Sequence, residues 1–472
     1  MALSNPALFV TLILCVVVFA SIEAAKEKKK STKIVQTSSA SAPSAGWFGG
    51  SQASPGDDAI RTSCEEVEDF VVNVRRDLHR FPELMYKETK TSAYIQSKLK
   101  ELDVNFSPGW AVNTKTDRIT GPGGTGIVAT IGTGTSPVVL LRADIDALPI
   151  HEEVESDIKS QTDGQMHACG HDGHTAMLLG AAKVLKVLEA SGKIKGTVKL
   201  MFQPAEEGGA GGKRMVEEGV LEDEPKVDMA FGIHLWPALP SGTVGGKPGV
   251  VLAACDRFEI MISGVGGHAA MPHLVVDPIV AQSALVSSLQ TIVSRKLSPL
   301  ESGVVSVTKI EGGSAFNVIP GAVTLWGTVR SLSTESLQKL IKSVEDISTG
   351  IAQTHGCNAT VRWSPDYYPP TMNDDDLWFG LGEKVASKVA ANGEVTPTNP
   401  TMGAEDFGFI AQSVPSNFYL LGQSSEKMKT DWNLHHPKFT MDETVLKRGV
   451  ELHVRSALEG LAMLAKNKKS EF

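Results

Sequence analysis

The chain has 472 residues, of which 42% are hydrophobic and 21% charged, and its formal net charge is −9. This length exceeds what one ordinary hydrophobic core supports, so we expect a globular protein of two domains with extensions. The acidic balance and the lack of a basic stripe exclude nucleic acid as an expected partner.

The first 24 residues have the pattern of a secretory signal peptide. The apolar run at residues 8–20 is too short to span a membrane, and Ala20 and Ala24 offer cleavage sites. We therefore expect a secreted or ER-lumen protein with no membrane association after cleavage; an uncleaved signal anchor is the alternative. Residues 25–60 are rich in Ser, Ala, Gly and Lys, which predicts a disordered linker.

Two further features bear on the compartment. The chain ends in Lys-Ser-Glu-Phe, which is not a KDEL-type retention signal. Sequons at Asn105 and Asn358 permit N-glycosylation in the secretory pathway, although such triplets often occur by chance.

Folded sequence is expected from residue 61. Apolar residues recur at helical spacing over residues 67–81, and a second helical pattern covers residues 91–102. Short apolar runs at residues 127–131 and 138–142, bounded by Gly and Pro, predict buried strands.

The second of these strands leads directly into Asp144 and Asp146. Side chains at i and i+2 point to the same side of an extended chain. In open α/β sheets, ligands bind outside the carboxyl ends of the strands, so these aspartates are candidate site residues. A capping or turn role is the alternative for either one.

Residues 166–174 gather three histidines, a cysteine, an aspartate and two glycines ahead of a helical pattern at residues 175–190. Thiolate and imidazole are ligands that borderline transition metals prefer. The glycines allow a turn tight enough for Cys169 and His171 to point at one centre. The alternative is a buried free cysteine beside helix-capping histidines.

Two more predicted strands end in residues that can bind a metal. Residues 196–202 lead into Glu206 and Glu207, and residues 229–233 lead into His234. Adjacent carboxylates project to different sides, so one can hold a metal while its neighbour holds water. Three strand ends thus carry Asp, Glu and His around a Cys/His loop, which favours a metal site over chance placement.

Residues 255–370 have a different pattern. Strand, helix, strand, strand, helix and strand are predicted at residues 257–262, 277–294, 304–310, 323–330, 334–354 and 359–365. This order is typical of a ferredoxin-like unit. It interrupts an α/β domain at residues 61–254 and 371–472, whose second part has a helix, a strand and a helix at residues 375–389, 417–422 and 442–466.

Eight motifs follow one another along the chain: RADIDALP (142–149), MHACGHDGHTA (166–176), FQPAEEGG (202–209), GIHLW (232–236), GGHAAMPH (266–273), FNVIPG (316–321), GAEDF (403–407) and HHP (435–437). In this order they resemble a group of metal-dependent amidohydrolases. The group contains plant hydrolases of auxin–amino-acid conjugates, hippurate hydrolases and N-acyl-amino-acid deacylases. It lies within the aminoacylase and carboxypeptidase-G-like metallopeptidase clan. The resemblance covers about residues 65–466.

The resemblance implies an α/β metallopeptidase fold in which a mixed α/β catalytic domain carries an inserted α+β lid and dimerisation domain. It also implies two divalent metal ions bound by Cys169, His171, Glu207, His234 and His435, with the Cys169 thiolate bridging. Many relatives have His-Ser-Pro where this chain has His435-His436-Pro437, and we assign the first position as the ligand. The softness of a thiolate favours Zn²⁺, but the resemblance to the plant group favours Mn²⁺, which is the expected metal with Zn²⁺ as the alternative.

The resemblance also implies roles in catalysis. Glu206 is the general base, which takes a proton from the attacking water and returns it to the leaving amine. Asp146 orients a histidine ligand. From the insert, His268 stabilises the tetrahedral oxyanion, often across a dimer interface, while Asn317 and Arg330 bind the substrate carboxylate. The alternative for the last two is a packed turn residue and an exposed strand-end arginine.

The expected reaction is metal-dependent hydrolysis of the amide bond of an N-acyl amino acid. Auxin conjugates and simple N-acetyl or N-benzoyl amino acids are both candidate substrates. The resemblance allows a homodimer through the insert, and the sequence leaves the oligomeric state open. The alternatives are a dipeptidase or deacetylase of the same clan, or a non-catalytic binding protein on this scaffold. The sequence leaves open the roles of Asp144, His167, His174 and His273.

Overall fold

The computed structural model describes residues 55–113 and 121–470. The predicted signal peptide, residues 1–24, and most of the predicted linker lie outside these ranges. The folded chain begins earlier than predicted, because helix α2 covers Pro55–Glu65. Long-range contacts anchor this helix: the Asp57 carboxylate accepts hydrogen bonds from Arg455 at 2.6 Å and from Lys388 at 3.1 Å.

Among the described residues, the large sheet has eight strands in the order β1-β2-β4-β3-β5-β16-β6-β15. Their bounds are Asn105–Val112 (β1), Gly123–Gly132 (β2), Val138–Asp144 (β3), Thr197–Gln203 (β4), Met229–Pro240 (β5), Val244–Gly246 (β6), Val395–Pro397 (β15) and Ser416–Ser424 (β16). Strands β4, β3, β5 and β16 run parallel, and β1 and β2 pair antiparallel to their neighbours. Strand β6 pairs antiparallel with β16 and parallel with β15.

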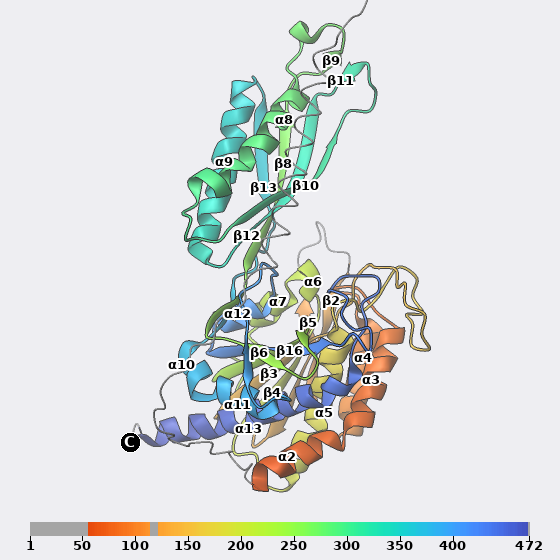
Figure 1. Ribbon diagram of the computed structural model, residues 1–472, viewed down its shortest axis with the longest axis vertical. Coiled ribbons are helices and arrows are strands. Elements are labelled where there is room, and N and C mark those ends of the chain that lie inside the picture. Colours follow the sequence, from red (N-terminus) through yellow and green to blue (C-terminus); the bar gives the residue numbers. More distant parts are fainter. Residues whose placement is uncertain (1–54, 114–120, 471–472) are drawn as a thin grey trace, which may run out of the picture. The chain divides into compact units, whose positions relative to one another are not determined.

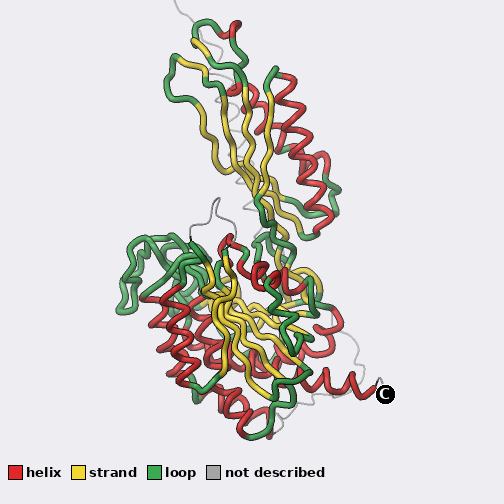
Figure 2. Tube along the Cα trace, turned by 180° about the vertical axis from the view of Figure 1, so that it is seen from behind, coloured by secondary structure: helices red, strands yellow, loops and turns green. Residues whose placement is uncertain are grey.

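Helices cover both faces of this sheet (Figures 1 and 2). One face packs against α3 (Glu68–Arg80), α4 (Thr89–Glu101), α5 (His171–Ala190), α11 (Glu383–Val389) and α13 (Leu446–Ser470). The other packs against α7 (Gly211–Glu217) and α12 (Phe407–Ala411). Successive side chains of β3 point to opposite faces of the sheet, so each face has its own hydrophobic core. Leu141 packs in the core under α5, and its neighbour Leu140 packs in the core on the other face.

The inserted segment forms its own four-stranded sheet, in the order β10-β12-β8-β13. Its elements are β8 (Ala254–Ser263), α8 (Pro278–Leu289), β10 (Val304–Gly312), β12 (Ala322–Ser331), α9 (Thr334–Thr354) and β13 (Asn358–Trp363). Buried residues of both helices and of the strands make a separate core. The β-α-β-β-α-β order is the predicted one, so the predicted fold class, α/β with an inserted ferredoxin-like α+β unit, is confirmed.

Shorter elements complete the described chain. The strands are β7 (Gly249–Leu252), β9 (Gly267–His268), β11 (Val318–Ile319) and β14 (Thr371–Asn373). The helices and turns are α6 (Glu206–Gly209), η1 (Pro272–Leu274), η2 (Ile292–Lys296), α10 (Asp375–Leu377), η3 (Trp378–Gly382) and η4 (Glu443–Val445). Within the ranges that the structure covers, no helix is both long and apolar enough to cross a membrane.

Parallel pairing brings the predicted site residues to one edge of the large sheet. Asp144 at the end of β3 pairs with Gln203 at the end of β4. The register of β3 with β5 pairs Arg142 with Gly232, so His234 follows at the level of Asp144. Because parallel strands end on the same side, residues from three distant parts of the sequence meet there.

Candidate active site

The Cys/His segment enters α5 through Gly170. This residue has φ 91°, a left-handed conformation that glycine adopts without strain. The helix starts at His171, four residues before the predicted start, so four residues of the cluster lie in its first turn. Cys169 precedes the turn and is buried, with 7% of its surface exposed.

The buried imidazoles of His171 and His234 are oriented in the same way, with Nδ1 on a backbone carbonyl and Nε2 on the other side of the ring. His171 Nδ1 donates a hydrogen bond to the Asp146 carbonyl at 2.9 Å, and His234 Nδ1 donates to the Leu235 carbonyl at 2.7 Å. These bonds leave each Nε2 as the nitrogen that can bind a metal ion, and His234 Nε2 lies 3.5 Å from the sulfur. Burial lowers the pKa of His234 well below its usual value, which keeps this imidazole neutral.

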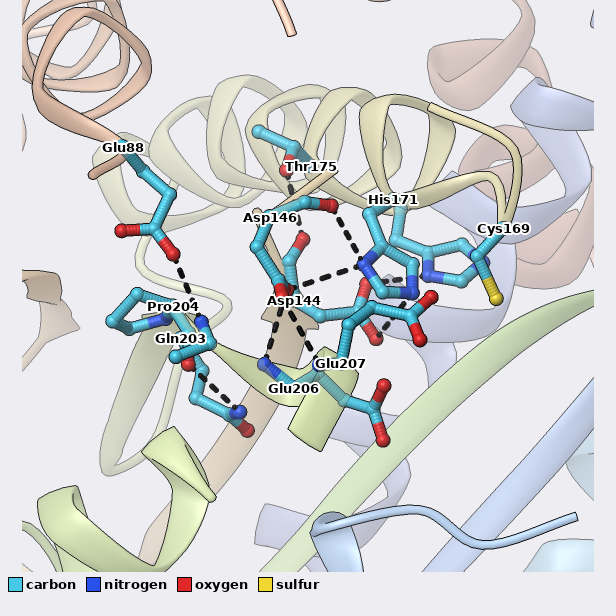
Figure 3. Close-up of polar contacts among 12 residues, drawn as sticks. Glu88, Asp144, Asp146, Cys169, His171, Thr175, Gln203, Pro204, Glu206 and Glu207 are labelled. Atoms are coloured by element: carbon cyan, nitrogen blue, oxygen red, sulfur yellow. Dashed lines mark hydrogen bonds and ion pairs between the residues drawn. The ribbon is translucent and has the colours of Figure 1, made fainter. Parts of the chain in front are cut away.

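Glu206 and Glu207 project from the short turn α6, which follows β4 (Figure 3). Both carboxylate oxygens of Asp146 hold this turn, since they accept the backbone amides of Glu206 and Glu207 at 3.0 Å each. In Figure 3 the Glu207 carboxylate points toward His171, whereas that of Glu206 lies further from it. The two neighbours therefore have different surroundings.

His435 completes the group from the C-terminal part of the chain. Its backbone amide donates to the Ala168 carbonyl at 2.8 Å, and its Nε2 lies 3.1 Å from Glu207 Oε1. The next residue, His436, instead stacks on Trp432 with ring centroids 4.3 Å apart. The geometry thus directs the first imidazole of the His-His-Pro motif to the site.

The donor atoms form two overlapping groups. In the first, ligand atoms of Cys169, His171 and His234 all lie within 4.8 Å of one another; in the second, so do those of Cys169, Glu207 and His435. Cys169 belongs to both groups. All five predicted metal ligands are therefore brought together, with the thiol in the middle.

Buried charges surround the Glu206 carboxylate. Its oxygen lies within 4.8 Å of oxygens of Glu405 and Asp406, and both of these contact the Arg142 guanidinium, at 2.8 Å and 2.9 Å. Burial raises the pKa of Glu206 well above its usual value, and Glu405 and Glu207 raise it further. Such a carboxyl is suited to accept and hold a proton.

The metal-binding group is rich in negative charge. Burial opposes protonation of His171, but Asp144 and Asp146 raise its pKa to about 10. Burial followed by the Glu207 charge raises the pKa of the Cys169 thiol well above its usual value. Without a metal ion, the His171 imidazole and the Cys169 thiol therefore hold protons, and the imidazolium balances part of the negative charge of the carboxylates.

A cavity of about 480 Å³ opens onto these residues. Its lining includes Cys169, Glu206, Glu207, His234 and His435. Apolar side chains of Trp236, Leu252 and Leu434 and the cations of Arg257 and Arg330 also line it.

The model for peptidase family M20/M25/M40 matches residues 140–459, more than half of the chain. The chain belongs to this family. It is 42% identical over 412 residues to "IAA-amino acid hydrolase ILR1-like 4" of Arabidopsis thaliana, which covers 85% of this chain and 90% of the relative. It is 40% identical to an N-acetyl-L-cysteine deacetylase of Bacillus subtilis, over 80% and 85% of the two chains.

Solved M20 structures share the fold. A Bacillus subtilis protein described as a dinuclear metal binding peptidase from this family superposes with a TM-score of 0.69 at 34% identity. The match covers 84% of the present chain and 99% of that chain.

Not every predicted site residue of this M20 protein lies at the cavity. Arg330 lines it, and its Nη1 donates to the Met402 carbonyl at 2.6 Å. His268 and Asn317 are exposed and lie outside the cavity lining. They lie together at the two-stranded β9/β11 sheet, where the Ala269 amide donates to the Asn317 carbonyl at 3.1 Å.

The structure gives surroundings to the residues whose roles the sequence left open. Asp144 binds His174 Nδ1 at 2.6 Å and Arg142 at 2.7 Å, and His174 Nε2 accepts the amide of Leu235, next to His234. Asp144 and His174 thus support the part of β5 that carries His234. His167 is fully buried, and His273 is exposed in η1.

Sequence reasoning missed several residues of the site. Glu405 lines the cavity, yet the GAEDF motif alone assigns it no role. Arg142 could have been identified from the sequence, because a guanidinium inside a predicted buried strand requires carboxylate partners. Tyr368, which also lines the cavity, has no signal in its local sequence.

Proposed function

We propose that this protein hydrolyses the amide bond of N-acyl amino acids in a metal-dependent reaction that releases the free amino acid and the acid. The observation that carries the proposal is the pair of donor groups that share Cys169, with the Glu206 carboxylate beside them. Relatives named as an IAA-amino acid hydrolase and an N-acetyl-L-cysteine deacetylase support the N-acyl amino acid class.

The residues at the site fit two divalent ions. His171 Nε2 is buried without a hydrogen bond among the described residues, and the Asp144 carboxylate lies 3.7 Å from it, so this nitrogen is available to a metal ion. Thiolate, imidazole and carboxylate together suit Zn²⁺ and also Mn²⁺. The five ligands would be Cys169, His171, Glu207, His234 and His435. When bound, the ions polarise the amide carbonyl and lower the pKa of the attacking water.

Glu206 is the proposed general base. It accepts the proton of the attacking water and returns it to the amine nitrogen as the carbon–nitrogen bond breaks. Asp146 holds the peptide groups of Glu206 and Glu207 and orients the His171 ring through its backbone carbonyl. This fixes the base relative to the ligands.

The cavity lining fits both ends of the substrate. Trp236, Leu252 and Leu434 offer an apolar wall for the acyl group, and the Arg330 guanidinium offers two donors to the carboxylate of the amino acid. The exposed positions of His268 and Asn317 support the further proposal that they serve the site of a second copy in a homodimer, where His268 donates to the oxyanion and Asn317 to the carboxylate.

We also propose the secretory pathway as the compartment, with a signal peptide at residues 1–24 and a linker that ends before α2. Both sequon asparagines, Asn105 and Asn358, are exposed at the first residues of β1 and β13, which supports this proposal. The sequence places the domain boundaries at 61–254 and 371–472 for the catalytic domain and at 255–370 for the insert, and α2 extends the first part of the catalytic domain back to Pro55.

The test is a substrate panel assayed for free amino acid with and without chelator. Indole-3-acetyl, N-acetyl and N-benzoyl amino acids should be hydrolysed, with activity lost on chelation and restored by Mn²⁺ or Zn²⁺. Release from dipeptides alone would instead favour the dipeptidase alternative. Binding without release from any conjugate would favour a binding protein.

A further inference from the structure

The segment that carries Glu206 has an unusual backbone. Ala205, Gly208 and Ala210 have φ values of 58°, 98° and 54°, all in the left-handed region, which residues other than glycine rarely adopt. Such a conformation persists only where surrounding contacts impose it. The contacts that hold this segment therefore decide where the Glu206 carboxylate lies.

One side chain makes three of these contacts. The Tyr368 hydroxyl donates to the Glu206 carbonyl at 2.7 Å and accepts the amides of Gly208 at 3.1 Å and Ala210 at 2.9 Å. A phenol has one donor and two acceptor positions, so its capacity is fully used. Burial raises the pKa of Tyr368 well above its usual value, so the hydroxyl stays protonated and can donate its hydrogen bond to the Glu206 carbonyl.

Tyr368 also belongs to the segment through which the chain returns from the insert. Its backbone pairs with that of Cys255 at the start of β8, with N–O distances of 2.8 Å and 2.9 Å. From the same outgoing strand, Arg257 Nη2 donates to the Gly208 carbonyl at 2.9 Å. The two chain crossings between the insert and the catalytic domain thus both hold the Glu206 segment.

We propose that Tyr368 is a positioning residue for Glu206, which fixes the catalytic turn from the return segment of the insert. The proposal rests on the proposed function for the role of Glu206. A merely structural role would need only the aromatic ring, which packs against Phe409 with centroids 6.0 Å apart. The hydroxyl is the part that orders the turn.

The test compares Tyr368→Phe with Tyr367→Phe. Tyr367 is a matched control, because its ring contacts the same Phe409 at 6.4 Å and its hydroxyl has no hydrogen bond to any described residue. For Tyr368→Phe we expect kcat to fall about 10- to 100-fold, with KM within about twofold and the metal content retained. Amide hydrogen exchange of metal-free protein should become faster in residues 205–210. The control should match the wild type in every respect.

Equal kcat and equal exchange in the two variants would overturn the proposal. The exchange measurement does not require turnover, so the positioning role of Tyr368 can be tested independently of the proposed hydrolase function. A wild type that releases no amino acid would remove the proposed function, whereas the exchange result would still decide the contact. If Tyr368→Phe does not fold, Arg257→Gln removes one bond to the same turn from an exposed side chain, and unchanged exchange in that variant would count against the proposal.

Discussion

Glu206 and Glu207 are adjacent in the sequence, but their carboxylates have different partners. Glu207 faces the His435 imidazole at 3.1 Å and belongs to the donor group of Cys169. Glu206 accepts the backbone amide of Asp406 at 3.3 Å and lies among buried carboxylates. The first arrangement suits metal binding and the second suits proton transfer.

We therefore predict that Glu206→Gln retains about two metal ions per chain and loses turnover by roughly 10²- to 10⁴-fold, because the amide cannot accept the proton. Cys169→Ser should instead lose metal, since it removes the atom that both donor groups share. Elemental analysis and single-turnover kinetics on both variants check this. Near-normal turnover in Glu206→Gln would exclude Glu206 as the base.

At the scale of elements, α5 packs closely against two other helices at Gly180. A Cβ atom there would lie 2.5 Å from Val71 Cγ2 of α3 and 2.7 Å from Val450 Cγ2 of α13. Both neighbours are β-branched side chains with little rotamer freedom in a helix. The close approach of three helices therefore depends on the missing side chain.

We predict that Gly180→Ala lowers the free energy of unfolding by about 1–2 kcal/mol, because overpacking outweighs the gain of about 1 kcal/mol in helix propensity. Gly350 of α9 is the matched control, since a Cβ there would meet nothing within 4 Å. Gly350→Ala should raise the free energy by about 0.5–1 kcal/mol. Chemical unfolding measures both, and a stabilised Gly180→Ala would contradict the packing.

The elements that the sequence predicted are those with local patterns. Buried strands such as β3 and β4 are predominantly apolar, so their carboxyl ends, and with them the position of Glu206, could be predicted from the sequence. Strand β1 was not predicted, because Pro108 and Gly109 interrupt it and the register shifts after Pro108. The helical pattern also did not show that α5 begins at His171, since Gly173 and the histidines are weak helix formers.

The site follows the same rule. Its ligand types could be read from strand ends and motifs, whereas the contacts that orient them are long-range. Tyr368 lies 162 positions from Glu206, and Asp406 lies 264 positions from Arg142. No local pattern encodes such pairs, because they arise only when parallel strands and the linking segments of the insert meet at one sheet edge.

At the scale of the whole molecule, His453 links stability to pH. It is 1% exposed within α13, and burial followed by the nearby His174 lowers its pKa to about 3, against about 6.5 in an unfolded chain. Between these pH values the unfolded state binds the extra proton. Folding stability therefore falls as the pH drops below about 6.5.

We predict that the free energy of unfolding of metal-free wild type falls by about 2 kcal/mol more than that of His453→Leu between pH 7.5 and pH 5. The exposed His151 supplies a control, and His151→Leu should show the wild-type pH dependence. Urea unfolding at the two pH values measures the difference. An equal fall in wild type and His453→Leu would show that His453 does not titrate on unfolding.

A shared active site across a dimer has its own test. We predict that His268→Ala and Glu206→Gln are each nearly inactive, and that a refolded equal mixture recovers about a quarter of the wild-type activity. Half of the randomly formed dimers are mixed, and each contains one site with an intact base and an intact His268 from its partner. No recovery from a mixture of dimers would place His268 outside the neighbouring site.

The most direct test of the central claim is the metal content of purified, folded and reduced protein, measured on the sample that is assayed for amino acid release. We predict about two divalent ions per chain, Mn²⁺ or Zn²⁺, and release from N-acyl amino acids that is lost when a chelator removes them and restored when they are returned. Release that persists in protein free of metal would contradict the claim.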